Sequence, residues 1–134
     1  MKLRAICKSK IHRAVVTAAD LHYVGSVGID ADLMRLTDII EGERVSLWNI
    51  NNGQRIETYA IALPAGSGHI IVNGAAARHF QAGDHLIIAA FCLTDEVVKP
   101  RMIAVDERNR FARFLSHEGS DDSLREPEPD PIAV

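Results

Sequence analysis

Apolar and β-branched residues occur along the chain in short runs that polar or glycine-containing segments separate. These runs have the length and composition of strands rather than of long helices. They predict strands at residues 3–7, 13–19, 27–30, 43–50, 54–63, 68–74 and 84–91, and two more within 101–115. No repeat with a fixed period and no heptad pattern is present.

Turn and cap residues divide these strands. Asn51, Asn52 and Gly53 lie between two β-rich runs, and Asn-Gly in that position predicts a hairpin. A turn at 107–109 divides the last run into two strands. Two short helical segments are expected, one at 31–37 with Asp30 as its N-cap and a single turn at 75–80.

Many short strands with turns between them predict a mainly β domain, a small barrel or sandwich with short helical turns. The chain has 134 residues, enough for one hydrophobic core. Such a small barrel leaves its strands poorly covered, so oligomerisation is expected. We place the folded domain at residues 1–115 and expect residues 116–134 to be a disordered tail, because this proline-rich segment has few apolar residues.

Charge and composition narrow the function. Residues 116–134 hold six acidic residues and one arginine, a net charge of −5, which leaves +2 for the rest of a chain whose total is −3. This nearly neutral body argues against a nucleic-acid partner. No apolar run reaches the length of a membrane span and no export signal is visible, so we expect a cytoplasmic protein with no membrane partner. Two widely separated cysteines predict no disulfide, and the histidine spacing predicts no metal site.

One apolar run, residues 21–30, contains the pair Gly25-Ser26, which alone reads most simply as a turn or bulge. Together with the stretches KSKIHR (8–13), NGQRIETYAI (52–61) and IVNGAAA (71–77), it resembles the aspartate decarboxylase family. This resemblance covers about residues 1–93, and more loosely up to 115. It implies a double-psi β-barrel that forms homotetramers and converts L-aspartate to β-alanine and CO₂ for pantothenate and coenzyme A biosynthesis.

The resemblance also implies a cofactor made from the chain itself. In this family the zymogen cleaves itself between the residues that match Gly25 and Ser26, and the serine becomes a covalent pyruvoyl group. Its ketone forms a Schiff base with aspartate and accepts the electrons released with CO₂. Ser26 would attack the Gly25 carbonyl, and we expect a strained backbone that glycine permits. Whether maturation needs an accessory protein stays open.

The family pattern assigns further roles. Tyr59 matches the proton donor, and Thr58 a substrate-binding residue that assists cleavage. Arg55 and Lys10 are the expected receivers of the substrate carboxylates. The remaining matches are a backbone-lined wall and supporting residues: Gly74, Ala75, Ala76, Asn73, His12 and Tyr23. Without the family pattern, Tyr59 reads as a core aromatic, Lys10 as a solvated lysine and His12 as a core histidine.

Some features fit less simply. Thr58 and Tyr59 are adjacent on a strand and should point to opposite faces, unless a bulge intervenes or a subunit interface uses both faces. The sequence departs from the family pattern at Gly28, at 63–68 and at Arg78, which precedes His79. We expect these departures to affect self-cleavage more than catalysis.

Two other functions remain open. Ser26 could be the nucleophile of a serine hydrolase, although Val24 stands where the Gly-x-Ser-x-Gly elbow needs glycine. The chain could also be a non-catalytic β-barrel binding module, which would keep an uncut chain and carry no reactive carbonyl.

Overall fold

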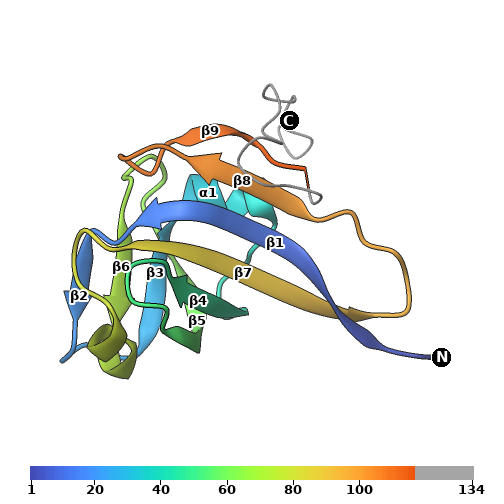
Figure 1. Ribbon diagram of the computed structural model, residues 1–134, viewed down its shortest axis with the longest axis horizontal. Coiled ribbons are helices and arrows are strands. Elements are labelled where there is room, and N and C mark those ends of the chain that lie inside the picture. Colours follow the sequence, from blue (N-terminus) through green and yellow to red (C-terminus); the bar gives the residue numbers. More distant parts are fainter. Residues whose placement is uncertain (117–134) are drawn as a thin grey trace.

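The computed structural model describes residues 1–116, which form mainly strands (Figure 1). The strands are β1 (Arg4–Val15), β2 (Ala18–Asp20), β3 (Ser26–Asp30), β4 (Arg44–Asn49), β5 (Arg55–Leu63), β6 (Ile70–Asn73), β7 (His85–Thr94), β8 (Arg101–Val105) and β9 (Phe111–Phe114). The helical segments are α1 (Ala31–Thr37) and the 3₁₀ helix η1 (Gly74–His79). The mainly β class is confirmed. The expected disordered tail lies outside the described residues, apart from Ser116.

All nine strands are linked in the order β2-β6-β3-β5-β4-β7-β1-β8-β9. The pairs β1/β8, β2/β6 and β3/β5 are parallel, and the other neighbours are antiparallel. This mixed pairing agrees with the double-psi barrel that the family resemblance implies. One face of each central strand packs into a shared core, whose fully buried side chains include Ile11, Val27, Leu47, Val72 and Ile88.

The prediction of two strands at 3–7 and 13–19 was wrong, because β1 continues through the polar segment between them. Two register shifts against β7 absorb this segment. Lys8 forms an ion pair with Glu43, 2.9 Å between Nζ and Oε2, and the buried Ser9 hydroxyl donates to the Thr37 carbonyl at 2.5 Å. Lys8 and Ser9 therefore have partners in the fold, and this polar segment does not interrupt the strand.

Asp30 caps α1 as predicted and also anchors a loop. Its carboxylate accepts the Asp32 amide at 2.9 Å, Gly66 at 3.0 Å and Gly68 at 2.8 Å. The side chain is buried, and these three donors replace the water that it loses. The segment 63–68 is therefore held against the start of the helix.

The two predicted hairpin turns are confirmed. The β4–β5 turn contains Gly53 at φ +77°, and its amide donates to the Asn49 carbonyl at 2.9 Å. The β8–β9 turn contains the buried Asn109 at φ +58°. The Asn109 amide group donates to the carbonyls of Val15 and Gly68, so it links this turn to β1 and to the loop that Asp30 anchors.

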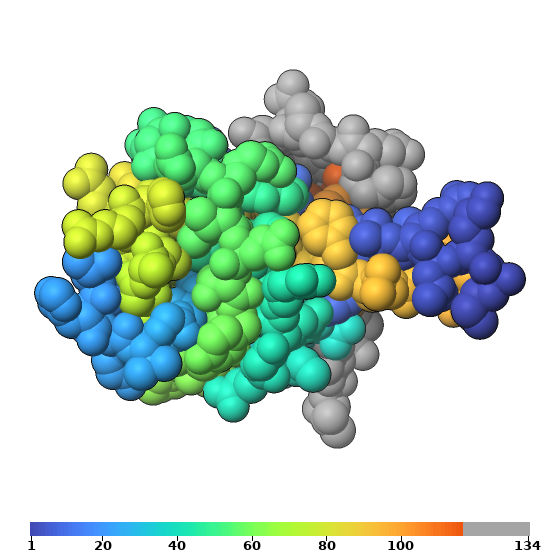
Figure 2. Space-filling model, turned by 90° about the horizontal axis from the view of Figure 1, so that it is seen from below, coloured from blue at the N-terminus to red at the C-terminus, as the bar shows by residue number. Residues whose placement is uncertain are grey.

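The N-terminal end of β1 and the C-terminal end of β7 extend together away from the body as a two-stranded ribbon (Figures 1 and 2). Cys7 and Cys92 lie on this ribbon as free thiols, and burial raises the pKa of the Cys7 thiol. No helix within residues 1–116 has the length and hydrophobicity of a membrane span.

Candidate active site

Five of the predicted site residues meet in one pocket of about 270 Å³. They come from three places in the chain: the segment before β3, the strand β5, and the junction of β6 with η1. The residues are Gly25, Thr58, Asn73, Ala75 and Ala76. Methyl groups and glycine line much of this wall, so it leaves room beside the Gly25–Ser26 bond for a small ligand.

Ser26 is the first residue of β3 and lies directly opposite Asn73 of β6. The Asn73 side-chain amide donates to Ser26 Oγ at 3.2 Å, and Oγ lies 3.5 Å from the Val24 carbonyl oxygen. Ser26 is only 2% exposed. The hydroxyl is therefore held close to the backbone that precedes it, and neither of these partners is a histidine of the kind a serine hydrolase needs.

Gly74 lies close to the Gly25–Ser26 segment. It has φ +72°, and a Cβ at this position would lie 2.6 Å from Gly25 Cα. Gly25 itself has no positive φ, and a Cβ there would come no closer than 4.0 Å to the Asn73 carbonyl oxygen. The expected backbone strain at Gly25 is thus not seen in its φ angle, and the left-handed glycine of the site is Gly74.

Thr58 and Tyr59 point to opposite faces of β5. The register against β4 runs without a shift from Arg44–Tyr59 to Val45–Thr58, so no bulge re-aims either side chain. Thr58 faces the pocket, whereas Tyr59 is 41% exposed and does not line it. The sequence left two explanations for site residues on opposite faces of one strand, a bulge or a subunit interface. The regular register excludes the bulge.

Besides Tyr59, four predicted residues lie away from the pocket. Arg55 stacks on Trp48, 4.1 Å from guanidinium carbon to ring centroid. Lys10 and His12 are on β1, which β4 and β7 separate from β5 in the sheet order, roughly 14 Å along the sheet at ordinary strand spacing. Tyr23 is 58% exposed in the segment before β3. A single chain therefore does not bring these side chains into the pocket.

The structure separates the roles of the two lysines of β1. The Lys8 ammonium binds the Glu43 carboxylate, the Ser9 hydroxyl and the Asp38 carbonyl. The Lys10 side chain makes no ion pair or hydrogen bond with any other residue in 1–116. The Lys8 side chain is therefore held by the fold, whereas the Lys10 side chain is not.

Sequence reasoning did not select two polar residues that line the pocket, Glu57 and His79. Glu57 directly precedes Thr58 in the stretch that resembles the family. Its position next to a predicted site residue could have identified it from the sequence. His79 ends η1, and its carbonyl accepts from the side-chain amides of Asn49 and Asn52 at 2.9 and 3.0 Å. Arg78, where the sequence departs from the family pattern, lines a separate hollow of the surface. His79, the next residue, is the one that lines the pocket.

Gly28, one of the departures from the family pattern, lies in the middle of β3. It pairs with Ile61 on one side and Ile71 on the other, and a Cβ would come within 3.0 Å of the Leu63 side chain. The small residue makes room for Leu63 in a strand that is fully paired.

The fold and the pocket together define a small, mainly β protein whose site lies beside the bond between the exposed Gly25 and the buried Ser26. The aspartate decarboxylase family model matches residues 1–112. The proteins named aspartate 1-decarboxylase from Burkholderia vietnamiensis and Burkholderia cenocepacia are 50% identical over 119 residues, and the one from Burkholderia ambifaria is 49% identical. Each alignment covers 85% of this chain and 93% of the relative. The chain belongs to the aspartate decarboxylase family.

Proposed function

We propose that this protein is a cytoplasmic aspartate 1-decarboxylase that forms β-alanine and CO₂ from L-aspartate for pantothenate biosynthesis. It acts with a pyruvoyl group that the chain makes from Ser26. Membership of the family supports the assignment of the reaction. The buried Ser26 hydroxyl, which lies close to the preceding backbone, supports Ser26 as the source of the pyruvoyl group.

Maturation begins when Ser26 Oγ attacks the Gly25 carbonyl carbon and the peptide nitrogen leaves, which gives an ester. The Asn73 amide holds Oγ at 3.2 Å, and the Thr58 hydroxyl faces the same pocket as Gly25 and can donate to the developing oxyanion. β-Elimination then releases residues 1–25 with a free carboxylate. Hydrolysis of the remaining dehydroalanine releases ammonia and leaves the ketone at the new N-terminus.

The residues present fit a small ketone at this position. Gly74 permits close contact with the Gly25–Ser26 segment, and the wall of Ala75 and Ala76 leaves room for the substrate. The pyruvoyl group supplies the electron sink for decarboxylation. Thr58 and the start of η1 position the substrate, and the Tyr59 hydroxyl holds the proton that is delivered to the substrate α-carbon.

A homotetramer would explain why predicted residues of β1 and β5 lie away from the pocket. Lys10, His12, Arg55 and Tyr59 are on β1 and β5, on side chains that do not line it. A neighbouring subunit that places this face over the pocket would bring an arginine fork and a lysine charge to the two carboxylates of aspartate.

Intact mass under denaturing conditions tests the proposal. Wild-type protein should give two fragments, residues 1–25 and a larger one that begins with a blocked residue derived from Ser26. Borohydride should reduce the ketone and abolish CO₂ release from aspartate. Ser26→Ala should give one full-length chain without activity, and CO₂ release by this variant would refute the mechanism.

A further inference from the structure

Three polar side chains follow one another along the exposed face of β5. Going along the strand, they are Arg55, Glu57 and Tyr59. Their partners across the β4–β5 pair are, in the same order, Trp48, Ser46 and Arg44. Residues directly opposite one another in an antiparallel pair point to the same side of the sheet, so these six residues share one surface.

An ion pair between Arg55 and Glu57 would be the ordinary outcome on this surface. The two residues are separated by roughly 6.6 Å along the strand, which their long side chains can bridge. The structure shows a different arrangement. Glu57 Oε2 lies 3.6 Å from Arg44 Nε, whereas the Arg55 guanidinium carbon lies 4.1 Å from the centroid of the Trp48 ring. Within residues 1–116, the Arg55 side chain forms no hydrogen bond or ion pair.

Stacking on Trp48 holds the Arg55 guanidinium and leaves its hydrogen-bond donors available. An aromatic ring interacts with the flat face of a guanidinium, while the N–H groups that bind a carboxylate lie at the edge of the group. An ion pair with Glu57 would instead use these N–H groups. Trp48 therefore fixes the position of the cation without occupying the donors that an external carboxylate needs.

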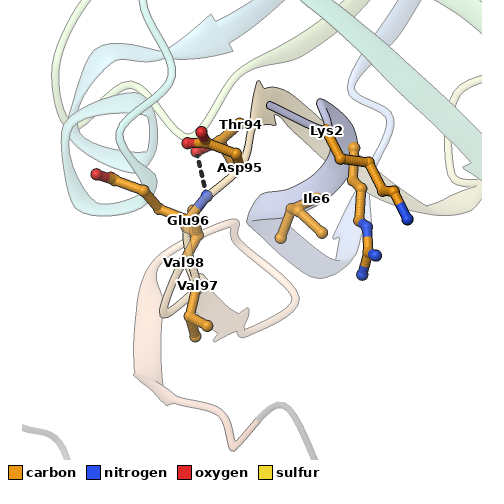
Figure 3. Close-up of a pocket in the computed structure, with 8 residues that line it drawn as sticks. Lys2, Ile6, Thr94, Asp95, Glu96, Val97 and Val98 are labelled. Atoms are coloured by element: carbon orange, nitrogen blue, oxygen red, sulfur yellow. Dashed lines mark hydrogen bonds between the residues drawn. The ribbon is translucent and has the colours of Figure 1, made fainter.

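The cations at the outer end of the β1–β7 ribbon are placed differently. Lys2 and Arg4 line a hollow of about 440 Å³, which Asp95 and Glu96 also line. Figure 3 shows Lys2 on one side of this hollow and the two acidic side chains on the other. The four formal charges cancel, so this hollow does not favour an anion in the way that the stacked Arg55 does.

We propose that Trp48 is a positioning residue for the substrate, because it keeps the Arg55 guanidinium away from Glu57 and ready for a carboxylate of aspartate. Glu57 also lines the pocket beside Gly25, so an acidic side chain borders a site for a dicarboxylate. Arg44 offsets the charge of Glu57. This inference rests on the proposed function, in which Arg55 receives a substrate carboxylate, and adds the residue that holds Arg55 in place.

Steady-state kinetics of aspartate decarboxylation test the role of Trp48. Trp48→Leu should raise KM about tenfold, because loss of the cation–π contact lets Arg55 turn toward Glu57, and should change kcat and self-cleavage little. The inhibition constant of succinate, a dicarboxylate without the amino group, should rise by a similar factor, since it measures binding without the chemical step. Trp48→Phe keeps an aromatic ring and should retain most of the affinity.

A second substitution separates positioning from support of the fold. In Glu57→Gln protein no carboxylate competes for Arg55, so Trp48→Leu should raise KM by less than about threefold in that background. A tryptophan that only supports the fold would give the same increase in both backgrounds. Phe114→Leu is the matched control, because Phe114 makes another arginine–aromatic contact, at 5.4 Å from Arg101, and neither residue lines the pocket. This control should keep the wild-type KM.

Circular dichroism checks that each variant is folded, and Trp48→Met, which keeps a long apolar side chain without a ring, replaces Trp48→Leu if that variant is not. An unchanged KM, or an equal rise in both backgrounds, would overturn the inference. Either result leaves the proposed enzyme intact if wild-type protein is cleaved at Gly25–Ser26 and releases CO₂. Wild-type protein that releases no CO₂ from aspartate would instead overturn the proposed function.

Discussion

At the scale of single residues, Gly74 combines two constraints that no other residue type satisfies. Its φ of +72° is a conformation that side chains with a Cβ adopt at a cost of roughly 1–2 kcal/mol. Its Cα hydrogen faces the backbone of Gly25, where a methyl group would meet atoms at 2.6 and 2.8 Å. Gly74 therefore determines how closely β6 can approach the bond that is to be cleaved.

We expect Gly74→Ala to slow self-cleavage by at least tenfold, because the added methyl group displaces the Gly25–Ser26 segment from Asn73. Gly83→Ala is the matched control: Gly83 has φ +93°, but a Cβ at this position would meet nothing within 4 Å. The control should lose about 1 kcal/mol of unfolding free energy and keep its cleavage rate. The cleaved fraction, measured by mass spectrometry against time after purification, distinguishes the two. Equal cleavage rates would contradict the role of Gly74.

At the scale of elements, polar side chains buried between strands hold the loops that flank the site. Asp30 joins β3 and α1 to the segment 63–68, and Asn109 joins the same segment to β1. These contacts fix the far end of β3, whose first residue is Ser26. The position of the reactive serine thus depends on hydrogen bonds at the opposite end of a five-residue strand.

Asp30→Ala should lower the unfolding free energy by about 2 kcal/mol or more, since it removes an N-cap and leaves buried amides without an acceptor. Asp32→Ala, two residues further along the chain in α1, should cost less than about 1 kcal/mol, because Asp32 only adds charge to the first turn. Urea denaturation of both variants measures the difference. Similar losses in the two variants would show that the Asp30 contacts to Gly66 and Gly68 contribute little.

The β8–β9 turn should give a pH-dependent contribution to stability. Amides of Arg110 and Arg108 donate to the Asp106 carboxylate and hold its pKa below the ordinary 3.8. A carboxylate whose pKa is lowered on folding stabilises the fold above the pKa of the unfolded chain, and this contribution disappears as the pH falls through the lowered pKa. Asp106→Asn should therefore be less stable than wild type at pH 7. The two should converge below pH 3.8 in thermal unfolding measured across pH, and a constant difference would contradict the assignment to ionisation.

Local signals predicted much of this structure, and tertiary contacts account for what they missed. The hairpin at Gly53 and the cap at Asp30 were correct because each depends on a few adjacent residues. The continuous β1 was missed, because the polar residues Lys8 and Ser9 find partners near α1 that are distant in sequence. His79 was not selected for a similar reason, since only the folded chain brings the end of η1 to the pocket.

At the scale of the whole molecule, the predicted site divides into residues that line the pocket and residues that lie away from it. Gly25, Thr58 and Asn73 line the pocket, whereas Lys10 is three strands from β5 in the sheet order. Motif matching selects residues by their identity and cannot say which copy of the chain supplies each one. If an active site combines the two groups from different subunits, two inactive variants should complement one another.

Co-expression of Ser26→Ala with Lys10→Ala tests this arrangement. In a randomly mixed oligomer, about a quarter of the sites receive an intact pocket from one chain and an intact Lys10 from its neighbour. Decarboxylase activity should therefore return to about a quarter of the wild-type level, although each variant alone is nearly inactive. Ser26→Ala with Asn73→Ala is the control pair: both positions belong to the pocket of one chain, so mixing restores no intact site. If neither pair regains activity, Lys10 does not reach the site from a neighbouring subunit, and the shared active site is wrong.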